Sequence, residues 1–205
     1  MKLYYSPGSC SLAPHIVMEE LGLKYEAIKV DLRNKDEAFK ELNRKGYVPA
    51  LVTDDDQLIT ENAAILQYLA AQKPELKLFP TEGMAKYRGL EALNFIATEV
   101  HKGFGNLWGM GRIFPDNQAA AKTLGDFTVA NLGRKFDVLT ETIQQSPFIL
   151  GKEFSVCDAY LFTVLGWTKF LKVDMSKWPE LLAYMERIQA RPSVKAAMKA
   201  EGILQ

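Results

Sequence analysis

Hydrophobic residues change their spacing near residue 80, and this change divides the chain into two parts. In the first part, short apolar runs bounded by Gly, Pro or Asp predict strands, and apolar residues recurring every three to four positions predict helices. The predicted strands lie at 2–5, 24–30, 49–53 and 57–60, and the predicted helices at 12–21, 35–43 and 61–72. Their order is a βαβ unit, a helix, a hairpin and a final helix.

This order combines a parallel strand pair with an antiparallel hairpin, which predicts a four-stranded sheet covered by helices. A thioredoxin-like α/β domain is the simplest match, and we place this N-terminal domain at residues 1–77. Residues 78–83 lie in a Pro-containing stretch typical of a linker. Residues 84–205 then form an all-α helical C-terminal domain, because strand signals are lost there.

Five helical patterns make up this second part, at 90–104, 119–145, 155–171, 179–190 and 193–201. Four glycines between positions 103 and 111 predict that the first of these helices ends or bends just past His101. Ser155 and Asp158 have the spacing of a capping box at the start of the third helix, with Asp in place of the preferred Glu or Gln. We expect Asp158 to be structural.

Composition and charge narrow the class of protein. The 205 residues are 48% hydrophobic and 24% charged, as in ordinary globular proteins, and 25 basic residues offset 25 acidic ones without clustering, so we expect no nucleic-acid binding. No run of 18 apolar residues or N-terminal apolar segment is present, so we expect no membrane span and a cytoplasmic location. Two cysteines and two histidines give no zinc-ligand spacing, and we expect no metal.

Cys10 is the first candidate for chemistry. Ser11 is the expected N-cap of the helix at 12–21, and the free N–H groups and positive dipole end of that helix would lower the thiol pKa from about 8.5. A small buried hydrophobe is an equally common role for a lone cysteine. Pro7 and Ala13 occupy the CxxC positions, which excludes an intramolecular dithiol mechanism. A mixed disulfide with a small thiol stays open.

Two further segments could hold a ligand. A cis proline at Val48-Pro49, before a predicted strand, would turn the Val48 backbone toward an extended, peptide-like ligand. If Thr60 or Asn62 caps the helix at 61–72, its free N–H groups would suit a carboxylate and Glu61 an amino group. An amino-acid zwitterion fits both features, but a plain N-cap is at least as common.

A polar cluster interrupts the apolar stripe of the helix at 90–104. Asn94 and His101 are seven residues apart and share a face, while Glu99 and Lys102 are neighbours on the surface. A histidine on such a face is more often a satisfied core residue, and such a charged pair is more often solvated.

Five segments carry a resemblance to a known family over nearly the full chain. They are MKLYYSPGSCSLAPHI at 1–16, GYVPAL at 46–51, TENAAILQYLA at 60–70, ATEVHKGF at 97–104 and FSVCDAYLF at 154–162. In this order they resemble the cytosolic glutathione transferases, and within them the bacterial beta class. The resemblance implies a glutathione-binding thioredoxin-like domain, a helical domain with a hydrophobic co-substrate site, and a homodimer.

The roles of individual residues follow from the resemblance. It implies that Cys10 faces the glutathione sulfur and can form a mixed disulfide with it, that His101 tunes the charge at the sulfur, and that Val48 pairs its backbone with the cysteinyl unit. The other positions that it implies for glutathione binding are Lys35, Glu61, Asn62, Asn94, Glu99 and Lys102, those of the helical domain coming from either protomer. Candidates for the hydrophobic site are Phe104, Leu107, Trp108 and Trp167.

The implied function is a glutathione transferase enzyme of detoxification, which conjugates the co-substrate glutathione to small hydrophobic electrophiles. Thiol-transferase, disulfide-reductase or peroxidase side activity would run through Cys10. Two alternatives stay open: a non-catalytic ligand carrier or regulatory protein of this fold, and a glutathione-dependent reductive dehalogenase or isomerase. Tyr5 and Ser11 are further candidates, because other classes of the family activate the thiol with a hydroxyl. Positions that depart from the family pattern are Tyr47, Asn62, Asn106 and Cys157.

Overall fold

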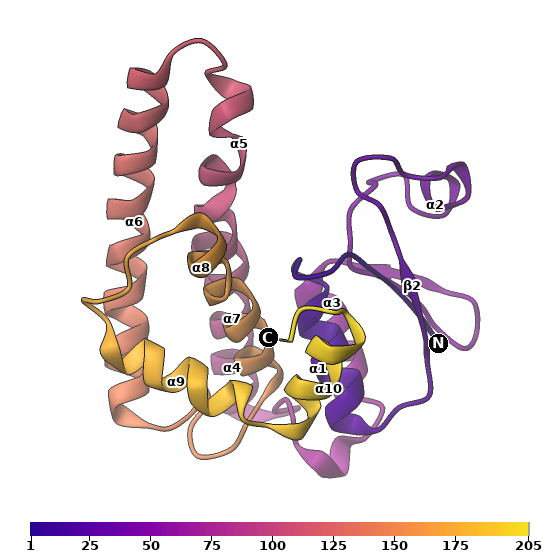
Figure 1. Ribbon diagram of the computed structural model, residues 1–205. Coiled ribbons are helices and arrows are strands. Elements are labelled where there is room, and N and C mark those ends of the chain that lie inside the picture. The colour runs from indigo at the N-terminus through magenta and orange to yellow at the C-terminus, as the bar shows by residue number, and fades with distance from the viewer. Residues whose placement is uncertain (205) are drawn as a thin grey trace.

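A four-stranded mixed sheet forms the core of the N-terminal part in the computed structural model, which describes residues 1–204 (Figure 1). The strands, in the spatial order β2-β1-β3-β4, are β1 (Lys2–Tyr5), β2 (Glu26–Lys29), β3 (Ala50–Val52) and β4 (Leu58–Thr60). β1 pairs with β2 in parallel, whereas β1 with β3 and β3 with β4 are antiparallel. This arrangement confirms the predicted thioredoxin-like α/β domain.

Three α-helices belong to this part, namely α1 (Leu12–Leu21), α2 (Glu37–Leu42) and α3 (Asn62–Ala70). α1 packs against α3 on one side and against α7 and α10 of the helical part on another, so most of its residues are buried. Pro14 is the third helical residue, as expected. Ser11 is the N-cap residue, as expected, but its side chain makes no cap hydrogen bond: Ser11 Oγ instead accepts from the Ser6 N–H at 3.1 Å and contacts Ser9 Oγ at 2.7 Å.

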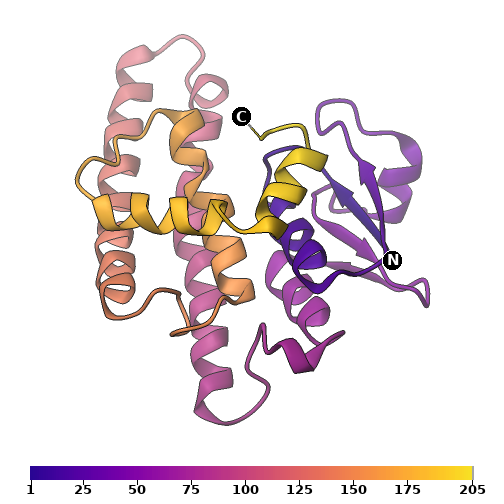
Figure 2. The ribbon, with the colours of Figure 1, turned by 60° about the horizontal axis from the view of Figure 1, so that its bottom comes forward.

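Beyond a short 3-10 turn, η1 (Pro74–Leu76), the rest of the chain is helical, which confirms the all-α C-terminal domain. Its helical elements are α4 (Gly83–Phe95), the π-helix η2 (Ile96–His101), the 3-10 turn η3 (Lys102–Phe104), α5 (Gly105–Ile113), α6 (Gln118–Gln145), α7 (Val156–Leu165), α8 (Trp167–Leu171), α9 (Pro179–Gln189) and α10 (Pro192–Ala200). Figures 1 and 2 both show α10 beside α1, so the end of the chain returns to the N-terminal part. The boundaries 1–77, 78–83 and 84–205 stay predictions.

Helical hydrogen bonding changes twice where the sequence predicted single patterns. Past His101, where η2 ends, the chain stays helical. It continues through η3 into α5, which ends at Ile113 and which the periodicity did not predict. A Cβ at Gly103 would lie 2.7 Å from Leu132 Cδ2, so this glycine lets α6 pack closely. The pattern at 155–171 divides at Gly166 into α7 and α8. The N–H of Gly166 donates to the carbonyl oxygen of Phe162, four residues back, whereas the N–H of Lys169 donates to that of Gly166, three residues back.

The predicted capping box is present at the start of α7. Asp158 Oδ2 accepts from the backbone N–H of Ser155 at 2.8 Å and from its hydroxyl at 2.6 Å. Within residues 1–204, none of the helices combines the length and apolar character needed to cross a membrane.

Candidate functional site

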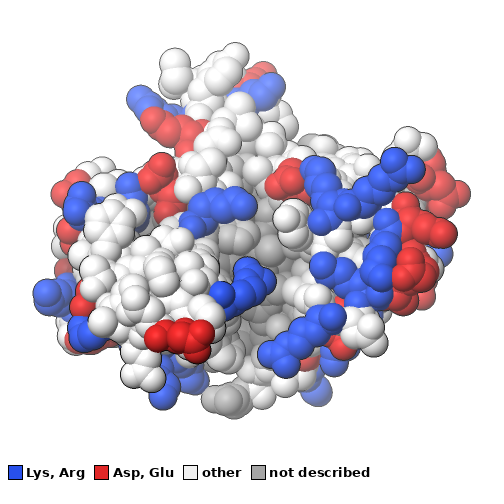
Figure 3. Space-filling view, turned by 90° about the horizontal axis from the view of Figure 1, so that it is seen from above, with Lys and Arg blue, Asp and Glu red and all other residues white. Residues whose placement is uncertain are grey.

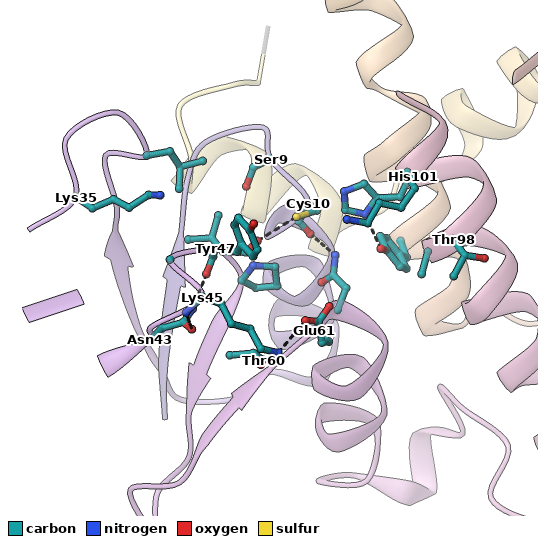
Figure 4. A pocket seen from close by; sticks show the side chains of 18 residues that line it. Ser9, Cys10, Lys35, Asn43, Lys45, Tyr47, Thr60, Glu61, Thr98 and His101 are labelled. Carbon is teal, nitrogen blue, oxygen red and sulfur yellow. Dashed lines mark hydrogen bonds and ion pairs between the residues drawn. The ribbon is translucent and has the colours of Figure 1, made fainter. Parts of the chain in front are cut away.

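A cavity of about 440 Å³ lies between the N-terminal sheet domain and the helical domain. The starts of α1 and α3, the loop before β3, the end of η2 and one residue of α7 form its walls. Figure 3 looks down between the two domains and shows a hollow with basic side chains along its sides, and Figure 4 shows the lining residues. Seven predicted site residues line this cavity: Cys10, Lys35, Val48, Glu61, Asn62, His101 and Lys102.

Cys10 lies two residues before the start of α1, and its thiol donates a hydrogen bond to the carbonyl oxygen of Val48 at 3.2 Å. The Val48-Pro49 peptide bond is cis. The pKa of the Cys10 thiol is raised to about 12, chiefly because the thiol is buried; a backbone hydrogen bond opposes this shift, the charge of Glu61 adds to it and that of Lys102 opposes it. The predicted lowering of this pKa is therefore wrong: loss of hydration outweighs the nearby helix end, and the thiol is protonated at neutral pH.

Glu61 occupies the N-cap position of α3 with a φ of +74°, a conformation that side chains other than glycine rarely adopt. Its carboxylate accepts from Lys45 Nζ at 3.0 Å, and the same ammonium reaches Thr60 Oγ1 at 3.0 Å. Neither Thr60 nor Asn62 caps the helix, which corrects the sequence expectation. Lys45 lines the cavity and was missed, although its place just before the GYVPAL segment was a usable signal.

Asn62, the first residue of α3, connects this helix to the start of α1. Its Nδ2 donates to the carbonyl oxygen of Cys10 at 2.8 Å, whereas its Oδ1 is buried without a partner. The departure from the family pattern at this position therefore places an amide beside the backbone of Cys10.

His101 ends η2, and its Nδ1 lies 2.7 Å from the hydroxyl of Tyr160 on α7. Burial, and then the charge of Lys102, lower the pKa of His101 to about 4, so the imidazole is neutral at pH 7. Its ring meets Trp167 edge-on, with the ring centroids 4.8 Å apart. Tyr160 also lines the cavity, and the sequence did not mark it, because a tyrosine in an apolar helix is usually part of the core.

Asn94 and Glu99 do not line the cavity within residues 1–204. The Glu99 carboxylate pairs with Lys135 at 2.6 Å, and the Asn94 carbonyl accepts from Thr98 Oγ1 at 2.9 Å. Their expected contacts with glutathione stay predictions.

A second cavity, of about 700 Å³, adjoins the first at Cys10 and Ser9. The loop at 6–10, residues 31–33 and the side chains of Trp108 and Trp167 form its walls. Two of the four predicted apolar residues therefore face it. Phe104 is fully buried between Phe136 and Trp167, and Leu107 packs against the core.

Comparison with known proteins assigns the chain to a family. Residues 8–72 match the model of the glutathione S-transferase N-terminal domain, and residues 118–187 match that of the C-terminal domain. Glutathione S-transferase GstA of Escherichia coli O157:H7 is 41% identical over 210 residues, which cover 99% of this chain and all of that protein. The chain belongs to the glutathione S-transferase family.

Two solved structures resemble the transferase over its whole length. The bacterial beta class glutathione S-transferase of Sphingomonas chungbukensis has a TM-score of 0.89 and 41% identity, with complete coverage of both chains (100%). A sphingomonad glutathione S-transferase in complex with glutathione has a TM-score of 0.88 and 41% identity, again with 100% coverage of both. The predicted resemblance to the beta class is confirmed.

The alternative hydroxyls and the departing residues of the transferase also have defined places. Ser11 is fully buried, its oxygen engaged by Ser6 and Ser9, and Tyr5 lies in the core, so neither hydroxyl lines the cavities. Tyr47 lines the first cavity with an exposed side chain. The Asn106 amide donates to Thr128 Oγ1 of α6 at 3.3 Å, and Cys157 is buried in α7.

Proposed function

We propose that this transferase binds glutathione in the first cavity and conjugates it with a hydrophobic electrophile held in the second. The observation that carries the proposal is the position of Cys10, which lies where the two cavities meet. A sulfur held beside Cys10 would face both the peptide-binding side and the side lined by Trp108 and Trp167. The sphingomonad relative with bound glutathione supports this use of the fold.

The charges of the first cavity suit a tripeptide with two carboxylates and one ammonium group. Glu61 would hold the γ-glutamyl ammonium after exchanging its present contact with Lys45. Lys35 would lie nearer the glycine carboxylate, and Val48 would pair with the cysteinyl unit. Asn62 would contact the γ-glutamyl end.

In the conjugation step, the glutathione thiol loses its proton to solvent and its sulfur attacks the electrophilic carbon. A carbon–sulfur bond forms, and the leaving group departs with the electron pair of the broken bond. Because burial keeps Cys10 protonated and His101 neutral, both can serve as hydrogen-bond donors to the sulfur. Hydrogen-bond donors at the sulfur stabilise the thiolate, and Cys10 would first exchange its present bond to the Val48 carbonyl oxygen, 3.2 Å away.

A side reaction of Cys10 follows from the same placement. Attack of its thiolate on oxidised glutathione would form a Cys10–glutathione disulfide and release one glutathione thiolate. A second glutathione would then free Cys10 and regenerate the oxidised form. We also propose a homodimer in a reducing cytoplasm, in which Asn94, Glu99 and Lys102 approach glutathione from either protomer.

The test measures the intact mass of the protein after incubation with oxidised glutathione, with wild type, Cys10→Ser and Cys157→Ala side by side. We expect one added glutathione on wild type and Cys157→Ala, and none on Cys10→Ser. The same three proteins are then assayed for conjugation of chlorodinitrobenzene, which Cys10→Ser should retain in part.

Each other outcome has a definite meaning. Full conjugation in Cys10→Ser without any adduct on wild type would move the mechanism to another hydrogen-bond donor, such as Ser11 or Tyr5. Loss of both adduct and conjugation in wild type would favour the non-catalytic carrier. Turnover of a halogenated or isomerisable substrate in preference to chlorodinitrobenzene would favour the dehalogenase or isomerase.

A further inference from the structure

The two ring nitrogens of His101 have different surroundings. Nδ1 lies 2.7 Å from the Tyr160 hydroxyl. Nε2 has no hydrogen-bond partner within residues 1–204, and it is not fully buried, so a ligand can reach it. Because the ring lines the cavity, Nε2 is the nitrogen open to a ligand, and Figure 4 shows His101 and Cys10 facing each other across that space.

The direction of the hydrogen bond at Nδ1 depends on Tyr160. Its side chain is buried, and burial raises the pKa of the phenol, so the hydroxyl keeps its proton. The neighbouring amide oxygen of Asn62 is buried without a hydrogen-bond partner, so it does not take the phenol proton, whereas His101 Nδ1 lies within hydrogen-bond distance of the hydroxyl. The proton of the hydroxyl is then left for His101 Nδ1.

The amide nitrogen of Asn62 carries two protons. One of them goes to the carbonyl oxygen of Cys10, at 2.8 Å. The other is available to Tyr160, and the unpartnered Oδ1 shows that the amide oxygen does not take up the phenol proton. The acceptor that the described residues offer to the phenol proton is therefore His101 Nδ1.

We propose that Tyr160 fixes His101 in the neutral tautomer that carries its proton on Nε2, which makes His101 a hydrogen-bond donor to the ligand sulfur and not a base. Which nitrogen of an imidazole is protonated is set by the hydrogen bond that the other one makes. The identity of the sulfur rests on the proposed function, but the tautomer does not. Tyr160 acts through His101 and is thus a positioning residue.

This assignment determines where the thiol proton goes during conjugation. A donor on Nε2 cannot accept the proton of glutathione, so the proton leaves to solvent and His101 stays neutral throughout. The groups that face His101 are its neighbour Lys102, Cys10 and Glu61 from the starts of α1 and α3, Tyr160 from α7 and Trp167 from α8. Lys102 disfavours protonation of the ring and Glu61 favours it, and burial exceeds both.

The tautomer can be measured by ¹⁵N NMR on full-length protein labelled in its histidines. The chain has two histidines, so His101→Asn assigns the signals and leaves His15 as an internal reference. We expect Nδ1 of His101 to resonate as an unprotonated and Nε2 as a protonated ring nitrogen, without titration between about pH 5 and 8. A protonated Nδ1 in the wild type would overturn the proposal.

Two variants connect the tautomer to Tyr160. Tyr160→Phe should give a mixture of the two tautomers and lower kcat for chlorodinitrobenzene about tenfold, with a smaller change in the KM for glutathione, because removal of a complete donor costs roughly 100- to 1,000-fold. Tyr184→Phe, the matched control, removes another buried phenol hydroxyl, one bonded to Asp158. It should leave the His101 spectrum unchanged. An unaltered His101 spectrum in folded Tyr160→Phe would contradict the positioning role.

Failure of the inference and failure of the proposed function give different results. Conjugation by a wild type with protonated Nδ1 would refute the tautomer and leave the function intact. The expected tautomer in a protein that does not conjugate glutathione would refute the function and leave the tautomer intact. If Tyr160→Phe does not fold, the spectrum of the wild type decides the assignment without it.

Discussion

The buried carboxylate of Asp158 accepts four hydrogen bonds, and Asp158→Ala removes all of them at once. Oδ1 accepts from the backbone N–H of Ile149 at 2.9 Å and from the Tyr184 hydroxyl at 2.8 Å. Oδ2 accepts from the N–H of Ser155 at 2.8 Å and from its hydroxyl at 2.6 Å. One side chain thus joins the start of α7 to α9 and to the loop after α6.

The size of the effect follows from the donors left behind. Alanine strands the two N–H groups and the Tyr184 hydroxyl, and a buried donor without a partner costs about 1–3 kcal/mol. Two effects offset part of this sum. Water can enter the vacated space, and the variant no longer buries a carboxylate, whose loss of hydration raises the pKa of Asp158 in the wild type. We expect a loss of roughly 3–5 kcal/mol of unfolding free energy. For a chain of this length, that corresponds to a Tm lower by roughly 6–20 °C.

Urea unfolding followed by circular dichroism, at one fixed protein concentration, measures this loss. Asp174→Ala is the matched control, because Asp174 is exposed and bonds to its sequence neighbour Ser176, whose backbone N–H lies 2.9 Å away. It should leave the unfolding midpoint nearly unchanged. A loss of less than about 1 kcal/mol in Asp158→Ala would refute the reasoning, since one unsatisfied donor alone costs that much. Glutathione affinity lost selectively in a fully folded Asp158→Ala would contradict the structural role.

Four further outcomes can be checked. Glu61→Gln should raise the glutathione Kd about tenfold or more in calorimetry, since a charge-assisted contact contributes roughly 1.5–3 kcal/mol; unchanged affinity would remove Glu61 from the ammonium site. Gly89→Ala places a Cβ 2.7 Å from Phe79 Cε2 and should lower the unfolding free energy in urea by about 1–3 kcal/mol; an unchanged urea midpoint would mean that Phe79 moves aside freely. Trp108→Ala should raise the KM for chlorodinitrobenzene without changing the glutathione Kd; an equal rise in both would contradict a separate second cavity. Because the pKa of Cys10 is about 12, iodoacetamide should alkylate the ligand-free thiol slowly at neutral pH and faster as pH rises, and rapid alkylation at pH 7 would refute the raised pKa.

The fold was predictable because the pattern of apolar residues reflects it locally. The alternation of short strands and helices before residue 80 defined the sheet, and the three-to-four-residue spacing beyond it defined the bundle. The structure differs from the prediction where packing between segments distant in the sequence determines the backbone conformation. Gly103 permits the close approach of α6, and Gly166 divides a continuous apolar pattern into two helices. Nothing in the spacing of apolar residues distinguishes an α-helix from the π turn at Ile96–His101.

The site was predictable where a residue type and its neighbours in sequence were sufficient. Cys10 and Glu61 each lie within two residues of the start of a helix, and the resemblance supplied Lys35 and Lys102. All four residues line the first cavity. Lys45 and Tyr160 were missed because their importance comes from partners distant in the sequence. Asn94 and Glu99 show the reverse case, since the resemblance implied a role for residues that lie outside the cavity of the single chain.

The pKa of Cys10 is raised where the sequence predicted a lowered one, and this difference affects how the site works. A helix terminus acts on any nearby thiol, but its effect is smaller than the loss of hydration that the tertiary structure imposes on this one. The same loss of hydration holds His101 neutral. The ligand-free cavity therefore contains a protonated thiol and an uncharged imidazole, and the negative charge that these groups can stabilise is that of the incoming sulfur. Glutathione therefore supplies the nucleophile in conjugation, and Cys10 acts as a nucleophile only in the disulfide reaction.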